Sequence, residues 1–532
     1  MAAEGAVRPL TKAQQLTLLA CILGSTTAFL DGTLVNVALP AIRADLGGGL
    51  ATQQWIVDGY LLTLGSLLLV GGSLGDIFGR RRVFAAGVAG FGAASLLCAL
   101  APDAPLLVAA RALQGVAGAL LVPSTLALIM DSFQEHQRAA AIGAWTAWTG
   151  IATAIGPLAG GLLVELGSWR WIFVVNLPLV AATLWLLEHA PRGRASAPAR
   201  VDWTGGLLAA LGLGGPVFAL IEQPRYGWSS GRVWPALVAG CALLVAFVVW
   251  ERRSRAPMLP LQLFAIRNFG VGNLSTFAYY ASLGTVTFFL VVFLQQVAGY
   301  SPLASGLSLM PLSVLMFLFA RRFGALADRF GPRLFMGVGP LVTAAGLLWL
   351  LARVDEHASY ASQILPGVVL FALGLALTVA PLTAAVLGSV GSGHSGVASG
   401  VNNAVARVAG MIAVAAVGAA VAGSFSSAVA TRLPTAVRAS APAARVAERP
   451  FLIDASAFAA VERPAVRRAL VGASLDAFRL AIGIAAALAA FSGLLSLLGI
   501  SNRRRPVRAA QCAGGALVGA SVDNVAEPVG AA

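Results

Sequence analysis

Two charged residues stand inside apolar stretches that are long enough to span a bilayer. Asp31 lies within the stretch from Leu16 to Pro40, about 13 Å from its Pro40 end at 1.5 Å per helical residue. A carboxyl side chain is too short to reach water from that depth. Because an unpaired carboxylate inside a bilayer is costly, Asp31 needs a cationic partner or a proton. Its type and position therefore predict a proton-handling site.

Arg111 is the expected partner of Asp31. It lies about 9 Å inside the span expected at 105–129, counted from the same face, within about one helical turn of Asp31 in depth. From the residues alone, an arginine that snorkels to the outer headgroups is the alternative. Asp58 lies about one turn inside the span expected at 54–75, beside Trp55. We expect Asp58 to be solvated from the outer side, and a supporting role in proton entry is the alternative.

The composition indicates a polytopic membrane protein. Hydrophobic residues make up 58% of the 532 residues and charged residues 11%, whereas charged residues make up about a quarter of an ordinary soluble domain. The mean hydropathy of +0.83 agrees with this class. The net charge of +14 comes from arginines strung between apolar runs, which act as topology signals, so we expect no nucleic-acid partner. The cysteines share no metal-ligand spacing, and no metal site is expected.

Fourteen stretches are long and apolar enough to span the bilayer. We expect an all-α fold of two six-helix bundles with two inserted helices. The expected parts are an N-terminal bundle at 14–190, inserted helices at 203–252, a C-terminal bundle at 266–500 with an external loop at 424–476, and a cytoplasmic tail at 501–532. Basic residues concentrate in one set of short loops. By the positive-inside rule, both termini are cytoplasmic and the protein lies in the cell inner (plasma) membrane.

A repeated loop supports the two-bundle architecture. The pattern G-x-x-x-D-x-x-G, with arginine after it, follows the second span of each expected bundle, at 72–82 and 324–333. Repeated halves are the usual construction of secondary transporters. One copy would also fit a positive-inside anchor, but two equivalent copies favour a cytoplasmic gating loop, in which glycines allow a tight turn and the acid accepts hydrogen bonds. The residues expected to form the first gating loop are Gly72, Asp76, Gly79, Arg80 and Arg81.

Other spans carry small and polar residues that indicate close packing and a cavity. In the fifth span, glycines at i and i+4 allow close helix approach and a proline allows a bend. These residues are Gly156, Pro157, Gly160 and Gly161. The candidate cavity residues are Asp58, Gln114, Phe277, Tyr280, Asn402, Asn403 and Arg407. Packing is the alternative for the aromatic residues, and hydrogen bonding between helices is the alternative for the asparagines and Arg407.

The motifs, taken in order, resemble those of the major facilitator superfamily, specifically its fourteen-helix branch of drug/proton antiporters. The loop at 72–82 resembles the signature loop between the second and third helices of that superfamily, and 31–40 resembles the first-helix motif of the branch. Further matches lie at 111–115, 156–161, 168–178 and 295–302. The resemblance covers residues 14–500. It implies that Arg111 takes part in proton transfer and that 156–161 is the antiporter signature.

These observations predict a proton-coupled secondary exporter of small amphipathic drugs, antibiotics or related metabolites that works by alternating access. Its expected partners are the substrate, protons and the lipid bilayer, and it is expected to act as a monomer without a cofactor. A proton-coupled importer of a nutrient, or an exporter of a dedicated lipid or metabolite, is the alternative on the same fold. An enzyme is not expected, because the four histidines are dispersed and no acidic pair accompanies them.

Overall fold

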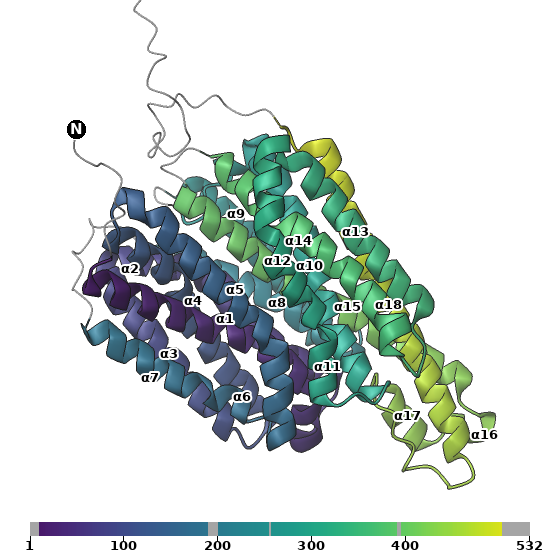
Figure 1. Cartoon of the computed structure of the whole chain (residues 1–532). Coiled ribbons are helices and arrows are strands. Elements are labelled where there is room, and N and C mark those ends of the chain that lie inside the picture. Colours follow the sequence, from purple (N-terminus) through teal and green to yellow (C-terminus); the bar gives the residue numbers. More distant parts are fainter. Residues whose placement is uncertain (1–9, 190–200, 255–256, 391–394, 503–532) are drawn as a thin grey trace, which may run out of the picture.

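Long helices build the chain in the computed structural model, which describes residues 10–189, 201–254, 257–390 and 395–502. Fourteen helical segments are long and apolar enough to cross a membrane, as the sequence predicted. They run roughly side by side (Figure 1). The described residues contain no strand. The chain is therefore an all-α, multi-pass membrane protein.

The first bundle holds six of these segments. It begins with a capping box, in which the Thr11 side chain accepts from the Gln14 N–H and the Gln14 side chain accepts from the Thr11 N–H. The sixth segment is broken into two helices at Val175. The helices are α1 (Lys12–Leu46), α2 (Leu50–Phe78), α3 (Arg80–Leu100), α4 (Ala104–Ser132), α5 (Glu135–Leu166), α6 (Trp171–Val174) and α7 (Asn176–His189).

Two further helices stand between the bundles in the sequence, α8 (Trp203–Tyr226) and α9 (Val233–Arg253). They pack on each other through glycines, and a Cβ on Gly215 would lie only 2.7 Å from the Gly240 Cα. Helix α8 also packs on α2 and on α15 (Ser395–Arg432) of the second bundle. Helix α9 is the least buried of the fourteen segments.

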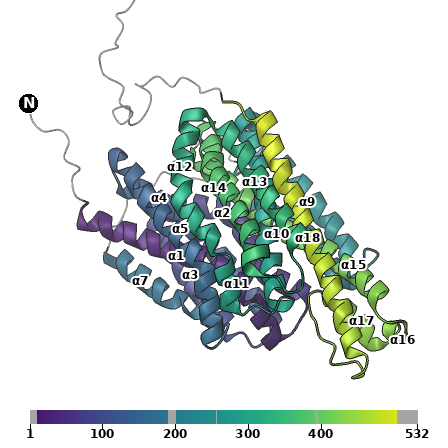
Figure 2. The same cartoon turned by 45° about the vertical axis from the view of Figure 1, so that its right-hand side comes forward.

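The second bundle lies beside the first, and one end of it projects past the first bundle (Figures 1 and 2). The remaining elements are η1 (Leu261–Ala265), α10 (Arg267–Gln296), α11 (Pro302–Ser308), α12 (Met310–Phe330), α13 (Pro332–Arg353), η2 (Tyr360–Ile364), α14 (Leu365–Gly388), α16 (Thr435–Arg438), α17 (Ala441–Ala447) and α18 (Arg463–Gly499).

Much of the segment 424–476, expected to be an external loop with some short helix, is helical. Helix α15 continues to Arg432 and α18 already begins at Arg463, with α16 and α17 between them. These ends project beyond the neighbouring helices (Figure 2). Buried side chains, including Phe425 and Leu470, and the contact of Phe451 with Phe289 at 6.2 Å between ring centroids hold this lobe together. Packing thus extends both helices beyond the apolar windows that hydropathy detects.

Turns that contain glycine mark both ends of the molecule, and at one end each bundle has an equivalent turn. The α2–α3 turn holds Gly79 with φ of 90°, and the equivalent α12–α13 turn holds Gly331 with φ of 91°. This left-handed conformation favours glycine, which explains the last glycine of each repeated loop. We call this end, where α1 also begins, the Gly79 end. The other end holds the α1–α2 turn with Gly48 and is called the Gly48 end.

Hydrogen bonds join the two bundles at the Gly48 end. They join three pairs of helices, α1 with α10, α5 with α11, and α2 with α15. They are Gln295 Nε2 to Val37 O at 2.9 Å, Arg43 Nη1 to Gln296 Oε1 at 2.5 Å, Ser301 Oγ to Glu165 Oε2 at 3.1 Å, and Gln54 Nε2 to Val414 O at 2.6 Å. The bundles are therefore closed against each other at this end.

Candidate functional site

Helix α1 presents two different faces at the depth of Asp31. Asp31 is 0% exposed and points into the first bundle. Phe29, Gly32 and Asn36 lie on the other side of the helix, at the spacing of one helical face, and are partly exposed. A Cβ on Gly32 would meet no atom within 4 Å. Asp31 is thus separated by its own helix from the open surface beside Gly32.

Asp31 forms a buried ion pair with Arg111 of α4. The distance from Arg111 Nη1 to Asp31 Oδ2 is 2.5 Å, and the two side chains are 1% and 0% exposed. The pairing expected from their depths is therefore present. The alternative of an arginine snorkelling to the headgroups is excluded in this conformation, because the guanidinium is enclosed by protein.

Two amide side chains complete the shell around the Asp31 carboxylate. Gln114 Nε2 donates to Asp31 Oδ1 at 2.9 Å, and Asn176 Nδ2 donates to the same oxygen at 3.2 Å. Both amides also donate to Ser95 Oγ, at 2.9 and 3.3 Å. Four helices, α1, α3, α4 and α7, therefore contribute to one polar cluster of Asp31, Ser95, Arg111, Gln114 and Asn176. We call it the Asp31 cluster.

Aromatic rings and a backbone carbonyl hold the Arg111 guanidinium. Its Nε donates to the Ile56 carbonyl at 3.0 Å. Its Cζ lies 4.4 Å from the centroid of the Tyr60 ring and 5.9 Å from that of Phe173. Such cation–π contacts gain strength where water is excluded. Helix α2 and the break between α6 and α7 thereby help to position the charge pair.

The sequence analysis did not assign Ser95, Tyr60 or Asn176 to the site. Asn176 lies in the motif at 168–178. It is the first residue of α7, directly after the helix break, and this position points its amide at Asp31. Ser95 gave no signal, since serine is common in membrane helices.

Two residues proposed for the cavity are sealed in this conformation. Gln114 is 0% exposed and belongs to the Asp31 cluster. Asp58 is also 0% exposed, which contradicts its expected solvation from the outer side. Both Asp58 carboxyl oxygens are buried without a hydrogen-bond partner among the described residues. A carboxyl in that state is stable only in its neutral form.

The other cavity candidates lie in α10 and α15 and are partly exposed. Asn402 Oδ1 accepts from Thr276 Oγ1 at 2.8 Å, which is the hydrogen bonding between helices considered from the sequence. Phe277 packs with a small alanine cluster between α10 and α15. Arg407 reaches the first bundle, with its Cζ 5.7 Å from the centroid of the Phe29 ring. Tyr280, Asn403 and Arg407 thus remain near the surface between the bundles.

The loop expected to act as a gate is a small charge network at the Gly79 end. Arg80 pairs with Asp76 at 3.1 Å and with Asp131 of α4 at 2.5 Å. Arg81 donates to the Leu187 carbonyl at the end of α7. A Cβ on Gly72 would lie 3.7 Å from Pro123, an ordinary contact. The loop therefore ties α2 and α3 to the ends of α4 and α7.

The glycines of α5 lie against both bundles. A Cβ on Gly160 would lie 3.1 Å from the Leu34 carbonyl of α1. A Cβ on Gly161 would lie 2.6 Å from the Leu303 Cα of α11, on the opposite bundle. Gly156 faces Thr33 of α1, and the backbone of Pro157 faces Gly306 of α11. The expected close helix approach is present, and it includes the contact between bundles.

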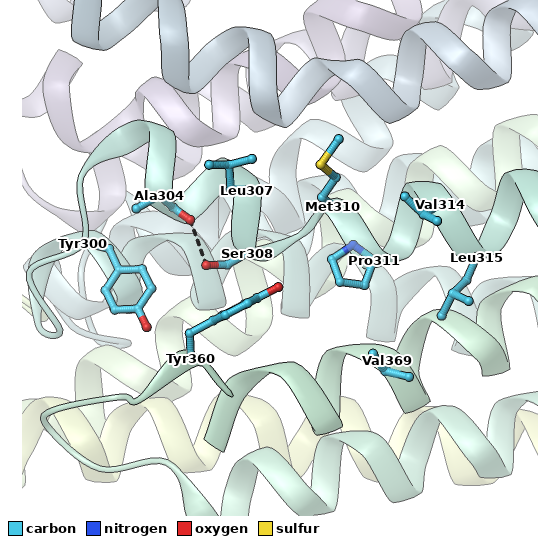
Figure 3. A pocket seen from close by; sticks show the side chains of 10 residues that line it. All are labelled: Tyr300, Ala304, Leu307, Ser308, Met310, Pro311, Val314, Leu315, Tyr360 and Val369. Atoms are coloured by element: carbon cyan, nitrogen blue, oxygen red, sulfur yellow. Dashed lines mark hydrogen bonds between the residues drawn. The ribbon is translucent and has the colours of Figure 1, made fainter. Parts of the chain in front are cut away.

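A separate apolar groove lies on the second bundle between α11–α12 and α14, with a volume of about 810 Å³. Figure 3 shows Tyr300 and Tyr360 at one end and Val314, Leu315 and Val369 at the other. No charged side chain lines it. Its apolar lining suits acyl chains of the surrounding bilayer and gives it no means of handling protons.

Two joined helical bundles, a loop repeated in each and an ion pair inside the membrane span define a secondary transporter. The comparison with known families agrees, since the Major Facilitator Superfamily profile matches residues 21–415. The chain belongs to the Major Facilitator Superfamily.

Two relatives from Streptomyces species are named for antibiotic resistance. The puromycin resistance protein of Streptomyces alboniger is 39% identical over 391 residues, covering 73% of this chain and 77% of the relative. The tetracenomycin C resistance and export protein of Streptomyces glaucescens is 36% identical, covering 76% and 75%. Among solved structures, a bacterial homolog of the human lysosomal transporter Spinster, inward-facing and unoccupied, has a TM-score of 0.61 at 17% identity, covering 94% of this chain and 100% of that one. That likeness concerns the fold.

Proposed function

We propose that the chain is a proton-driven exporter of small amphipathic compounds, including antibiotics, that works by alternating access. The observation that carries the proposal is the sealed Asp31–Arg111 pair between the first and fourth spans. A titratable acid with a single cationic partner at that depth suits proton coupling, and intramembrane acids mark proton relays in transporters. The relatives named for resistance and export support the outward direction.

The geometry suggests how coupling works. In this conformation Asp31 accepts from Arg111, Gln114 and Asn176, an arrangement that suits the carboxylate form. Protonation would break the ion pair and leave the Arg111 charge with only neutral acceptors, which is costly in a dry site. The protonated form of Asp31 therefore belongs to the opposite conformation, in which the cluster opens to water. Proton uptake and release are thereby tied to the movement of the bundles.

The orientation follows from the basic loops. With the Gly79 end in the cytoplasm, both termini are cytoplasmic and the contacts at the Gly48 end close the outer side. Substrate then enters from the cytoplasm while Asp31 is deprotonated. The Asp76–Arg80–Asp131 network and the glycines at 156–161 serve as the contacts that alternate between the two conformations. The chain works as a monomer in the plasma membrane.

The drive is sufficient for uphill export. One charge moved across the membrane supplies about 2.3 kcal/mol per 100 mV, and the proton gradient adds about 1.4 kcal/mol per pH unit. Since about 1.4 kcal/mol corresponds to a tenfold concentration ratio, one proton per substrate supports a gradient larger than tenfold.

Asp31→Asn tests the proposal. The amide keeps the shape of the carboxyl but cannot titrate, so we expect loss of resistance to puromycin and tetracenomycin C in an efflux-deficient bacterial host that gains it from the wild type. Vesicles energised with a pH gradient should show no uphill puromycin transport by the variant.

Asp45→Asn is the matched control, because Asp45 lies in the same helix but forms an exposed pair with Arg170 at its end. It should retain resistance. Uphill transport by the Asp31→Asn variant would refute the coupling role of Asp31. Net movement of puromycin toward the face of the membrane that is cytoplasmic in cells would contradict export.

A further inference from the structure

Arg407 is a charged residue in a spanning helix without an acidic partner. It lies in α15, and none of the ion pairs found among the described residues includes it. The other arginine of the helix, Arg432, is its last residue and pairs with Asp476. An intramembrane arginine normally faces a polar space and pairs with a group of opposite charge. For Arg407 the described protein supplies no such group.

The guanidinium of Arg407 lies where the two bundles meet. Its Cζ is 5.7 Å from the Phe29 ring centroid of α1, and its Cβ would lie 3.5 Å from a Cβ on Gly65 of α2. Tyr280 of the second bundle packs against the cluster that holds Ala409 and Ala413, which follow Arg407 in α15. Phe29 belongs to the partly exposed face of α1, beside the open space at Gly32. Arg407 is therefore a positive charge next to open space between the bundles.

Acidic residues do not cancel this charge. Asp31 is neutralised by Arg111, and it and Asp58 are each 0% exposed, so neither faces the space between the bundles. The spanning helices hold other acids with described side chains. All of them lie near helix ends except Asp476, which pairs with Arg432 at the end of α15. They are Asp45, Asp76, Asp131, Glu165, Glu188, Glu222, Glu251, Asp328 and Asp476. The open surface between the bundles thus has a net positive character at this depth.

We propose that the surface formed by Phe29, Asn36, Tyr280, Asn403 and Arg407, the Arg407 face, binds the anionic group of an aromatic substrate. Arg407 donates charge-assisted hydrogen bonds to a carboxylate or an ionised phenol. The Phe29 and Tyr280 rings pack on the aromatic body, and the two asparagine amides supply neutral hydrogen bonds. This inference rests on the proposed function and names aromatic anions as the substrates that the Arg407 face favours; puromycin, an amine, would be exported without a contribution from Arg407.

Binding of charge-matched probes to the purified full-length protein tests the proposal. The probes are tritiated 2-naphthoate, its methyl ester and 2-naphthyl-trimethylammonium, measured in a scintillation proximity assay. Wild-type protein should bind 2-naphthoate about tenfold or more tightly than the trimethylammonium probe, as expected for one hydrogen bond to a charged partner. Arg407→Gln should weaken naphthoate binding by about tenfold or more and change methyl-ester binding by less than about twofold.

Two variants serve as controls. Arg407→Lys keeps the charge and should retain most of the preference for the anion, although it lacks the planar fork of arginine. Arg353→Gln removes an exposed arginine at the end of α13, and it should bind all three probes like the wild type.

Several outcomes would overturn the proposal. They are equal or tighter binding of the cation by the wild type, an equal loss of ester and anion binding in Arg407→Gln, and no naphthoate binding at millimolar concentration. The wild-type comparison stands even if Arg407→Gln does not fold. Because the assay needs no gradient, its result is independent of whether Asp31 couples transport to protons.

Discussion

At the scale of single residues, the Asp31–Arg111 pair depends on the neutral side chains around it. Removing each ion from water costs several kcal/mol, and the attraction between the two repays this only when the remaining donors and acceptors are also satisfied. Gln114 and Asn176 supply donors to the carboxylate, and the Ile56 carbonyl accepts from the guanidinium. The cluster therefore behaves as one unit, and loss of a neutral member should affect proton coupling.

Asn176→Leu tests this dependence. The change removes donors to Asp31 and Ser95 and keeps the number and branching of side-chain heavy atoms. A hydrogen bond to a charged group contributes about 1.5–3 kcal/mol, so we expect proton-driven transport to slow by about tenfold or more. Because one donor to the carboxylate is lost, the pH profile of transport should differ from that of the wild type. The measurement is puromycin transport into energised vesicles across a pH series.

Thr183→Val is the control for Asn176→Leu. Thr183 is a buried polar residue of the same helix, but its hydroxyl donates to the Leu179 carbonyl of its own helix at 2.7 Å. Its pH profile should match that of the wild type. An unchanged pH profile in Asn176→Leu, with only a lower protein yield, would show that Asn176 stabilises the fold without positioning Asp31.

The sequence predicted the two charges of this cluster and named Gln114 as a cavity residue, but it did not indicate Ser95 or Asn176. Asp31 and Arg111 were recognised because charged residues are rare and costly at membrane depth. Ser95 and Asn176 were missed because neutral polar residues are common in such helices, and their roles depend on which faces meet. For Asp58 the depth along the span could not show that neighbouring helices cover the carboxyl group completely.

At the scale of elements, helix α5 connects the internal packing of the first bundle with the contact between bundles. Its glycines allow α1 to approach from one side and α11 from the other. The fourteen spans and this close packing were predictable, because apolar length and small-residue spacing are local properties of the chain. The extension of α15 and α18 beyond the membrane was not predictable from hydropathy, because side-chain contacts made far apart in the sequence hold the lobe.

Gly161→Ala should shift the protein away from the conformation described here. The added Cβ would lie 2.6 Å from the Leu303 Cα and from the Pro302 carbonyl, both backbone positions that cannot yield by a rotamer change. We expect α11 to be pushed from α5 and the Gly48 end to open. Spin labels at Pro102→Cys and Glu356→Cys, one in each bundle at that end, should report longer distances by double electron–electron resonance.

Gly150→Ala provides the comparison within the same helix, since a Cβ at Gly150 would meet no atom within 4 Å. Its distance distribution should equal that of the unsubstituted, doubly labelled protein. Identical distributions for Gly161→Ala and Gly150→Ala would mean that the α5–α11 contact does not hold the Gly48 end closed.

At the scale of the whole molecule, the two ends differ in what holds them together. Side-chain hydrogen bonds join the bundles at the Gly48 end, whereas the Arg80 network at the Gly79 end lies within the first bundle. The repeated loops predicted that two equivalent bundles exist. They could not predict which end is closed, because both conformations of a transporter use the same sequence.

The proposed orientation is tested with two matched glycines at opposite ends of the molecule. Gly231, in the α8–α9 turn, lies at the Gly48 end, and Gly388, the last residue of α14, lies at the Gly79 end. Both are exposed, and a Cβ at either position would meet no atom within 4 Å, so a cysteine should be tolerated equally well at each. In a background without native cysteines, a membrane-impermeant maleimide added to intact cells should label Gly231→Cys and leave Gly388→Cys unlabelled. Inverted vesicles should give the opposite pattern. Labelling of Gly388→Cys in intact cells would reverse the orientation, and the conformation closed at the Gly48 end would then be closed toward the cytoplasm.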